Sequence, residues 1–385
     1  MGQLSRSNVT NSPAVINPED AGYGDRVAAE LQHFHEKTVV LDLPPIYHYW
    51  SNKWILPKLH AFGLFGVTEM FEKYLVQHCQ AAGTRECRFL SIGSGNCETE
   101  LDLARRLRAK GLHNFVIECL ELNPAMLARA QADAERDGVA AHLLFVQADL
   151  NSWRAVRTYD VVLAAQILHH VIHLEGLFAQ VRQALAPTGH FVVADMIGRN
   201  GHLRWPEALD IVQEYWQELP SSYRYNRQLG RQEDQFVNWD CSNEGFEGIR
   251  AQDILPLLLQ SFHFEIFVAF GNAVLPFVDR AFGPNFDASQ AWDQDFVDRV
   301  HLRDHQEMLA GRIKPTIMCA VMGRDTSVPT QYLAPFSPEF CVRGGVPSAN
   351  VLQEQLDLAR RQIDQAAQSK RLRLGRSLGF GPNLR

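Results

Sequence analysis

Apolar runs with the length of buried strands alternate with segments of helical spacing between about residues 88 and 196. The apolar runs lie at 89–92, 115–120, 142–146, 159–164 and 190–194. The segments between these runs repeat their apolar positions every three or four residues, as amphipathic helices do. This alternation predicts parallel βαβ units and therefore a doubly wound, Rossmann-like α/β fold. Two later apolar runs, at 264–270 and 316–322, bring the expected mostly parallel sheet to seven strands.

The regular alternation covers only part of the chain. Changes in composition divide the rest of the chain into further segments. We expect a flexible N-terminus at 1–24, a helical cap at 25–87, and a core at 88–323 with lid inserts at 197–250 and 271–312. Within the cap, a helix over 68–78 would place Phe71, Leu75 and Cys79 on one face. Segment 220–231 has the composition of a loop. The C-terminal extension, 324–385, is expected to be partly disordered, with a helix near 351–368.

Composition and charge narrow the class of protein. The 385 residues are 46% hydrophobic and carry a formal net charge of -7, which argues against nucleic acid as a partner. The seven cysteines include no CxxC pair, so a reducing, cytoplasmic setting is expected. Residues 1–17 have no apolar signal-peptide core, and the longest apolar runs are too short to span a bilayer. We therefore expect no stable membrane insertion.

Segment 89–101 reads as a strand, a tight turn and the first turn of a helix. Glycine at 93 and 95 lets the backbone turn sharply and lets a ligand approach closely. The free N–H groups of the following helix would face that ligand, so a nucleotide-like cofactor is expected here. A dinucleotide fingerprint would have a third glycine where this chain has Glu98, which weakens the case for NAD.

An acidic residue follows the second predicted strand. The Glu121 carboxylate can accept hydrogen bonds from both hydroxyls of a ribose. Dinucleotide-binding enzymes place an acid at the same point, so this residue alone does not discriminate between cofactors.

Five motifs in order over residues 88–196 resemble those of the class I S-adenosylmethionine-dependent methyltransferases. They are Ile92-Gly-Ser-Gly-Asn-Cys97, Cys119-Leu-Glu-Leu-Asn-Pro-Ala-Met126, Phe145-Val-Gln-Ala-Asp-Leu150, the strand from Tyr159 with Gln166-Ile-Leu-His-His170, and Leu185-Ala-Pro-Thr-Gly189 with its strand. The third glycine of the first motif is replaced by Cys97.

The resemblance implies S-adenosyl-L-methionine as the cofactor and a set of residues that bind it. The turn of Gly93, Ser94 and Gly95 would hold the amino-acid end of the cofactor, Glu121 the ribose, and Asp149 the adenine amino group. The same resemblance places four further residues at the cofactor: Leu122, Met126, Leu150 and Gln166.

Methyl transfer from a sulfonium requires alignment of the nucleophile and, for a hydroxyl acceptor, removal of a proton. His169 and His170 follow the fourth strand and titrate near neutrality, so they are candidate bases. Asp195 ends the fifth strand and faces the same crevice. For all three residues, packing or helix capping is the competing interpretation.

Two segments outside the resemblance are candidates for binding the acceptor. Aromatic residues gather before the core at Tyr47, Tyr49 and Trp50, and arginine and aromatic residues gather in the first insert at Arg204, Trp205, Tyr223 and Tyr225. Core packing or a solvated lid surface is the alternative for each group. Asp240 and Cys241 lack the spacing of a metal site, and we expect no metal.

The sequence therefore predicts a methyltransferase that acts on an oxygen or nitrogen atom of a small-molecule, glycan or lipid-linked biosynthetic acceptor. An NAD(P)-dependent oxidoreductase and a non-catalytic cofactor-binding scaffold of the same fold remain as alternatives.

Overall fold

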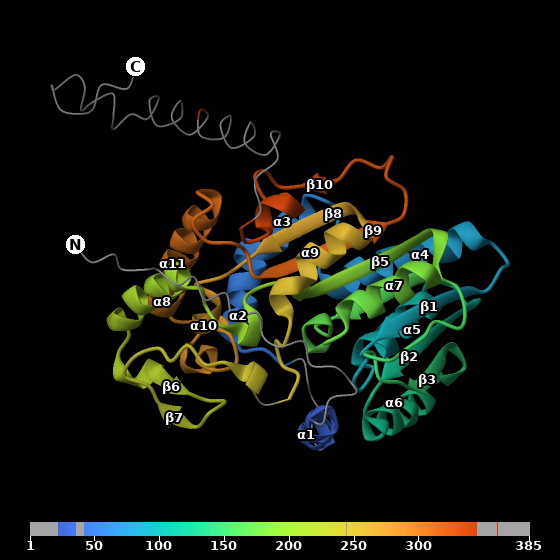
Figure 1. Ribbon diagram of the computed structural model, residues 1–385, viewed down its shortest axis with the longest axis horizontal. Helices are drawn as coiled ribbons and strands as arrows, with labels where there is room; N and C mark the ends of the chain where they lie inside the picture. Colours follow the sequence, from blue (N-terminus) through green and yellow to red (C-terminus); the bar gives the residue numbers. More distant parts are fainter. Residues whose placement is uncertain (1–21, 36–41, 244, 345–359, 361–385) are drawn as a thin grey trace, which may run out of the picture.

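The computed structural model describes residues 22–35, 42–243, 245–344 and 360. The expected tail helix at 351–368 and nearly all of the N-terminal lead-in lie outside these residues. Within them, strands and helices alternate through the middle of the chain, and further helices precede and follow that alternation (Figure 1).

One large sheet organises the molecule (Figure 1). Its order is β10-β8-β9-β5-β4-β1-β2-β3, and only β9 runs antiparallel to its neighbours. The strands are β1 (Cys87–Ile92), β2 (Phe115–Glu121), β3 (Leu143–Gln147), β4 (Tyr159–Ala165), β5 (Leu185–Met196), β8 (His263–Phe270), β9 (Ile317–Gly323) and β10 (Gln331–Tyr332). The strand order reverses between β1 and β4, which is the switch point where open α/β sheets bind ligands.

The sheet has eight strands, so the predicted number of seven is wrong by one. The additional strand is β10, whose two residues pair in parallel with Ile266 and Phe267 of β8. A two-residue edge strand has no apolar run, and the pattern along the chain could not reveal it.

Helices cover the sheet. On the side of β1, β2 and β3, α4 (Val67–Ala82) packs on α5 (Glu98–Ala109), and α5 packs on α6 (Pro124–Arg136). Elsewhere α7 (Leu174–Ala184) packs on α9 (Ala251–Ser261). Right-handed crossovers that run in opposite directions from β1 and β4 place α5 and α7 on opposite faces of the sheet.

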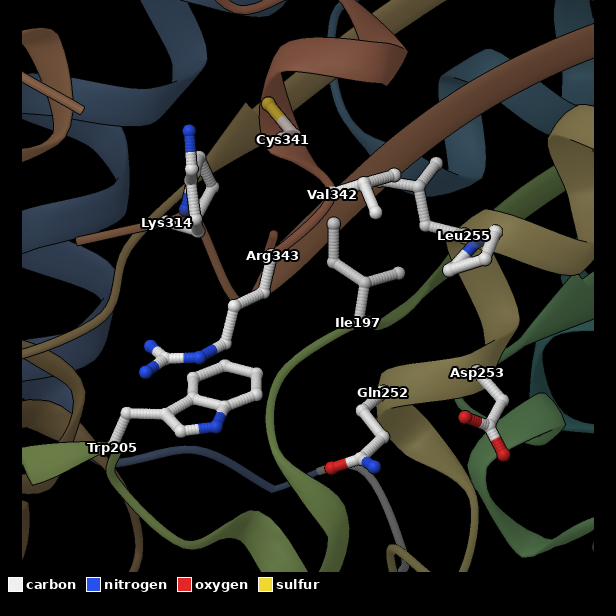
Figure 2. Close-up of a pocket in the computed structure, with 11 residues that line it drawn as sticks. Ile197, Trp205, Gln252, Asp253, Leu255, Lys314, Cys341, Val342 and Arg343 are labelled. Atoms are coloured by element: carbon white, nitrogen blue, oxygen red, sulfur yellow. The ribbon is translucent and has the colours of Figure 1, made fainter. Parts of the chain in front are cut away.

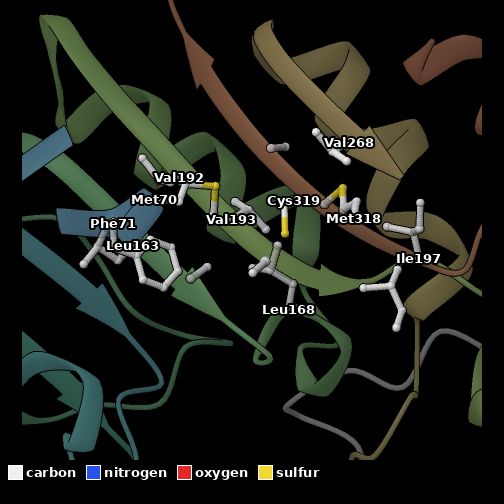
Figure 3. Packing of buried hydrophobic residues seen from close by; sticks show 14 of the residues in the cluster. Met70, Phe71, Leu163, Leu168, Val192, Val193, Ile197, Val268, Met318 and Cys319 are labelled. Carbon is white, nitrogen blue, oxygen red and sulfur yellow. The ribbon is translucent and has the colours of Figure 1, made fainter. Parts of the chain in front are cut away.

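The central strands are buried on both faces, and the hydrophobic core lies there. Figure 3 shows Met70 and Phe71 of α4 beside Leu163 of β4 and Val192 of β5. Phe71, Leu75 and Cys79 are all buried, as the apolar stripe of that helix predicts.

Helices also form the segments before β1 and several of the segments after β5. Ahead of β1 lie α1 (Tyr23–His35), α2 (Pro45–Trp50), a π-helical turn (Ser51–Ile55) and α3 (Leu56–His60). The later segments contain α8 (Pro206–Glu218), the hairpin of β6 (Tyr225–Asn226) and β7 (Arg231–Gln232), α10 (Leu275–Val278), α11 (Ala291–Leu309) and α12 (Pro338–Cys341). The expected loop at 220–231 therefore contains a short helical turn and most of a hairpin.

Among the described residues, no helix has both the length and the apolar character needed to cross a bilayer.

Candidate functional site

The glycine turn after β1 has a conformation that only glycine adopts without strain. Gly93 and Gly95 have φ values of 64° and 56°. A Cβ added to Gly93 would lie 2.0 Å from Cγ1 of Ile167, in the loop after β4. The turn is thus pressed against a second loop at the switch point, and α5 begins directly after it with its free N–H groups at the crevice.

Glu121 ties this turn to the loop after β2. Its carboxylate accepts hydrogen bonds from the backbone N–H of Gly95 and from that of Asn123, each at 2.9 Å. Burial raises the pKa of Glu121, although these N–H groups oppose the rise. The carboxylate therefore holds two loops in register beside the turn.

Asp149, which follows β3, contacts α1. One of its oxygens accepts a hydrogen bond from the Tyr23 hydroxyl at 2.6 Å, and the other accepts from the N–H of Asn151 at 2.9 Å. Farther along α1, the carbonyl of Leu31 accepts a bond from the Asn123 side chain at 3.4 Å. This helix therefore lies across the loops after β2 and β3.

The other predicted cofactor residues lie on these loops, on the loop after β4 and on α6. Met126 is buried on α6, and its Cε lies 3.4 Å from the position of a Cβ on Gly95. Gln166 has a φ of 53° and donates its N–H to the carbonyl of Ala194 at 2.8 Å. Leu122 follows β2, and the nearly buried Leu150 follows Asp149.

Asp195 and His169 form a buried pair at the ends of β5 and β4. The His169 Nδ1 lies 2.6 Å from Oδ1 of Asp195, and the other oxygen of Asp195 accepts the N–H groups of Ile167 and Leu168. Burial alone would raise the pKa of Asp195, but His169 and these N–H groups lower it overall. Burial likewise opposes protonation of His169, and Asp195 reverses this effect and raises its pKa.

Glu247 brings three histidines together. Its carboxylate lies 3.4 Å from Nε2 of His169, 3.3 Å from Nε2 of His170 and 2.6 Å from Nε2 of His202. The Nδ1 of His170 lies 3.0 Å from Glu30 of α1. We call these four residues — His169, His170, His202 and Glu247 — the histidine cluster.

Charges within the histidine cluster influence one another strongly. Burial opposes protonation of His170, but Glu247 and Glu30 raise its pKa to about 10. Burial would raise the pKa of Glu247, and the histidines instead hold it far below its usual range. Sequence reasoning missed Glu247 and His202, because neither lies in a motif or near the other members along the chain.

The structure distributes the aromatic and arginine candidates for acceptor binding over several places. Trp50 is fully buried and donates to Nδ1 of His301 at 3.1 Å, while Tyr47 packs against it. Tyr49 donates to Asp298 and Tyr223 donates to Asp293, at 2.9 Å and 2.7 Å. These contacts tie the candidates to α11.

Three candidates from the first insert lie apart from that group. Burial lowers the pKa of Arg204, whose Nε has no hydrogen-bond partner. Trp205 packs under the guanidinium of Arg343, 4.6 Å from its ring centre, and Tyr225 is partly exposed.

Two of the pockets on the described surface lie away from the candidate site. One, of about 280 Å³, lies beside Ile197 and is lined by Trp205, Lys314 and Arg343 among others (Figure 2). The second, of about 500 Å³, lies at Arg88 and Asp160, where β1 and β4 begin. Neither contains the glycine turn or the histidine cluster, so we place the candidate site by the sheet's switch point and its side chains.

The fold and the site define a Rossmann-like protein. It has a glycine turn after β1, an acidic residue at the end of β2 of the kind that binds a ribose, and a polar cluster at the carboxyl ends of β4 and β5. Residues 90–191 match the family model of a methyltransferase domain. The chain therefore contains a methyltransferase domain over these residues, with S-adenosyl-L-methionine as its cofactor. A comparison with curated protein sequences finds no match.

Solved structures that resemble the chain include other methyltransferases. The carbon methyltransferase DszA is 17% identical with a TM-score of 0.30, and the match covers 34% of this chain and only 35% of that chain. An S-adenosylmethionine-dependent methyltransferase from Mesorhizobium loti is 18% identical, with coverage of 68% and 100% and a TM-score of 0.36.

Geranyl diphosphate C-methyltransferase from Streptomyces coelicolor, solved with Mg²⁺, geranyl diphosphate and S-adenosyl-L-homocysteine, is 10% identical, with coverage of 78% and 98% and a TM-score of 0.42. Scores this low carry no argument about the acceptor.

Proposed function

We propose that the protein transfers a methyl group from S-adenosyl-L-methionine to an oxygen or nitrogen atom of a small-molecule or glycan acceptor. The observation that carries this proposal is the Asp195–His169 pair at the ends of β5 and β4. An acceptor that reaches Nε2 of His169 would stand beside the loop that packs on the glycine turn.

In this proposal the cofactor lies along the carboxyl ends of β1, β2 and β3. Gly93, Ser94 and Gly95 would bind its amino-acid end, and Glu121 would bind its ribose. Asp149, which already accepts the Tyr23 hydroxyl, would face its adenine. Leu122, Met126, Leu150 and Gln166 would complete the walls of this pocket.

His169 is the proposed proton acceptor for a hydroxyl nucleophile. Asp195 fixes the proton of its ring on Nδ1, so the lone pair of Nε2 faces the histidine cluster. Asp195 acts as a positioning residue, and His170 lies beside His169 with a ring-centre separation of 4.5 Å. An amine acceptor would need this base less, because it can lose its proton to water.

The exposed fractions of the side chains in the histidine cluster indicate the size of the acceptor. The side chains of His169, His170 and His202 are 4%, 14% and 20% exposed, whereas that of Glu247 is 39% exposed. Side chains as buried as these histidines are more accessible to a small molecule or the end of a glycan than to a folded protein surface. We propose that the helical cap (25–87) and the inserts at 197–250 and 271–312 select the acceptor.

Labelled S-adenosyl-L-methionine tests the proposal. The protein is incubated with small-molecule extracts and the labelled cofactor, and methylated products are identified by mass spectrometry. We expect His169→Ala to lose turnover while it keeps its affinity for S-adenosyl-L-homocysteine. Cofactor binding without any labelled product would favour the scaffold alternative, and tight NADH binding without S-adenosyl-L-methionine binding would contradict the proposal.

A further inference from the structure

The geometry of the histidine cluster points to a binding site for a divalent first-row transition-metal ion. We infer that Nε2 of His169, Nε2 of His170 and the Glu247 carboxylate bind this ion. These three ligand atoms lie within 4.8 Å of one another. The assignment rests on the proposed function, because the ion would lie where the acceptor is expected, and it departs from the sequence-based expectation of no metal.

Distances from the carboxylate to the two rings fit an ion better than direct hydrogen bonds. The Nε2 atoms of His169 and His170 lie 3.4 Å and 3.3 Å from the oxygens of Glu247. A charge-assisted N–H···O bond is usually about 2.7–2.9 Å long. Ligand atoms bound at about 2.1 Å around a tetrahedral ion lie about 3.4 Å apart.

The second nitrogen of each ring faces a carboxylate of its own. A neutral imidazole has one N–H, and in both rings the Nδ1 faces a carboxylate: Asp195 at 2.6 Å for His169 and Glu30 at 3.0 Å for His170. With the proton on Nδ1, each Nε2 turns a lone pair toward the Glu247 carboxylate. In this tautomer both Nε2 atoms and the carboxylate oxygens can bind one ion.

An ion that binds here displaces the Nε2 protons that the rings carry in the ion-free protein. Protonation of both rings would place two positive charges in imidazoles whose centres are 4.5 Å apart, while His202 lies 5.2 Å from His169. Carboxylates on the far nitrogens are the partners that metal-bound histidines commonly have, and they orient the rings. His202, whose Nε2 lies 2.6 Å from Glu247, would orient the third ligand.

The ligand set indicates the kind of ion and its chemistry. Two imidazoles and one carboxylate suit Fe²⁺, Zn²⁺ and similar ions, and they leave positions open for an acceptor oxygen. A bound ion of this kind lowers the pKa of a hydroxyl that binds it.

The bonds formed and broken in the methyl transfer are as follows. The acceptor O–H proton leaves to water, an oxygen lone pair forms the bond to the methyl carbon, and the S–CH₃ bond breaks with its electron pair on sulfur. The products are the methyl ether, S-adenosyl-L-homocysteine and one proton. In the ion-bound protein His169 is a ligand, and water replaces it as the proton acceptor.

The test measures metal content and affinity apart from activity. The full chain, purified without chelators, is analysed by elemental mass spectrometry and titrated with Zn²⁺ and, under anaerobic conditions, with Fe²⁺. We expect one ion for each chain, and at least about a tenfold loss of affinity in His170→Ala and Glu247→Gln. The Co²⁺-loaded protein should show a visible absorption band that these variants change.

His113→Ala is the matched control, because His113 is an exposed histidine outside the cluster. Absence of a stoichiometric ion, or equal losses in His113→Ala and His170→Ala, would overturn the assignment. If Glu247→Gln does not fold, as judged by circular dichroism, His170→Ala decides.

Methyl transfer by the same preparations separates this inference from the proposed function. Transfer that persists in the metal-free protein refutes a role of the ion in the reaction and leaves the proposed function standing. Stoichiometric metal binding without transfer to any acceptor supports the metal site and contradicts the proposed function.

Discussion

Glu100 allows a quantitative prediction, because this carboxyl group is buried directly beneath the glycine turn. It lies in the first turn of α5, is 4% exposed, and accepts a hydrogen bond from the Ser91 hydroxyl at 2.6 Å. Its second oxygen has no hydrogen-bond partner. Burial raises the pKa of Glu100 from 4.5 to about 7, although the bond from Ser91 opposes the rise.

The shift implies a loss of stability as the pH rises. Between the two pKa values the folded state binds a proton that the unfolded state has released, so the free energy of unfolding falls from about pH 4.5 to about pH 7. A difference of about 2.5 between the pKa values, at about 1.36 kcal/mol for each pKa unit, amounts to about 3 kcal/mol. Above about pH 7 this cost is constant.

Glu100→Gln keeps the shape of the side chain and removes its charge. We expect the variant to gain stability over the wild type by about 2–3 kcal/mol more at pH 8 than at pH 5. Urea unfolding at both pH values measures the difference. Glu135→Gln, at an exposed glutamate of α6, is the control and should give no such change. If the Glu100→Gln advantage is the same at both pH values, Glu100 is not protonated in the folded protein and the reasoning fails.

Three further changes test the site and its surroundings. Gly93→Ala should destabilise the turn and weaken S-adenosyl-L-homocysteine binding at least about tenfold, as measured by calorimetry. The reason is that a Cβ at Gly93 meets the loop after β4, whereas a Cβ at Gly111 meets nothing within 4 Å. Equal effects of Gly93→Ala and Gly111→Ala would contradict this prediction. Tyr23→Phe removes the 2.6 Å bond to Asp149 and should raise hydrogen exchange in α1, and unchanged exchange would show that this bond does not hold the helix. Lys58→Met should raise the melting temperature by a few degrees below about pH 8. Burial lowers the pKa of the Lys58 ammonium, which has no hydrogen-bond partner, to about 8, and below that pH the charged form destabilises the fold. An increase that appears only well above pH 8 would contradict this prediction.

The elements proposed to bind the cofactor were visible in the sequence because their signals are local. Gly93, Glu121 and Asp149 each end or follow a strand that is mostly apolar, so the end of the strand and the type of residue there could both be recognised. The same reasoning found His169 and Asp195, because parallel strands bring their carboxyl ends to one edge. Their 2.6 Å contact is a property of the folded sheet.

What the sequence could not show depends on contacts between distant segments. Glu247 reaches the histidines from an insert without periodicity, and no spacing rule connects it to them. The 19-residue helix α11 was missed because it buries Asp293, His301 and Asp304 along with apolar residues, which obscures the apolar face. The edge strand β10 was missed because its pairing depends on β8.

The position of α1 has a consequence for the order of events at the site. Its Tyr23 contacts Asp149 on the side proposed for the cofactor, and its Glu30 contacts His170 on the side proposed for the acceptor. A ligand that changes the contact of Tyr23 and a ligand that changes the contact of Glu30 therefore act on the same helix, α1. By reciprocity of linked equilibria, cofactor and acceptor should therefore alter each other's affinity by the same factor. Slower hydrogen exchange throughout 23–35 on addition of S-adenosyl-L-homocysteine alone would reveal this coupling, and exchange that slows only near Tyr23 would exclude it.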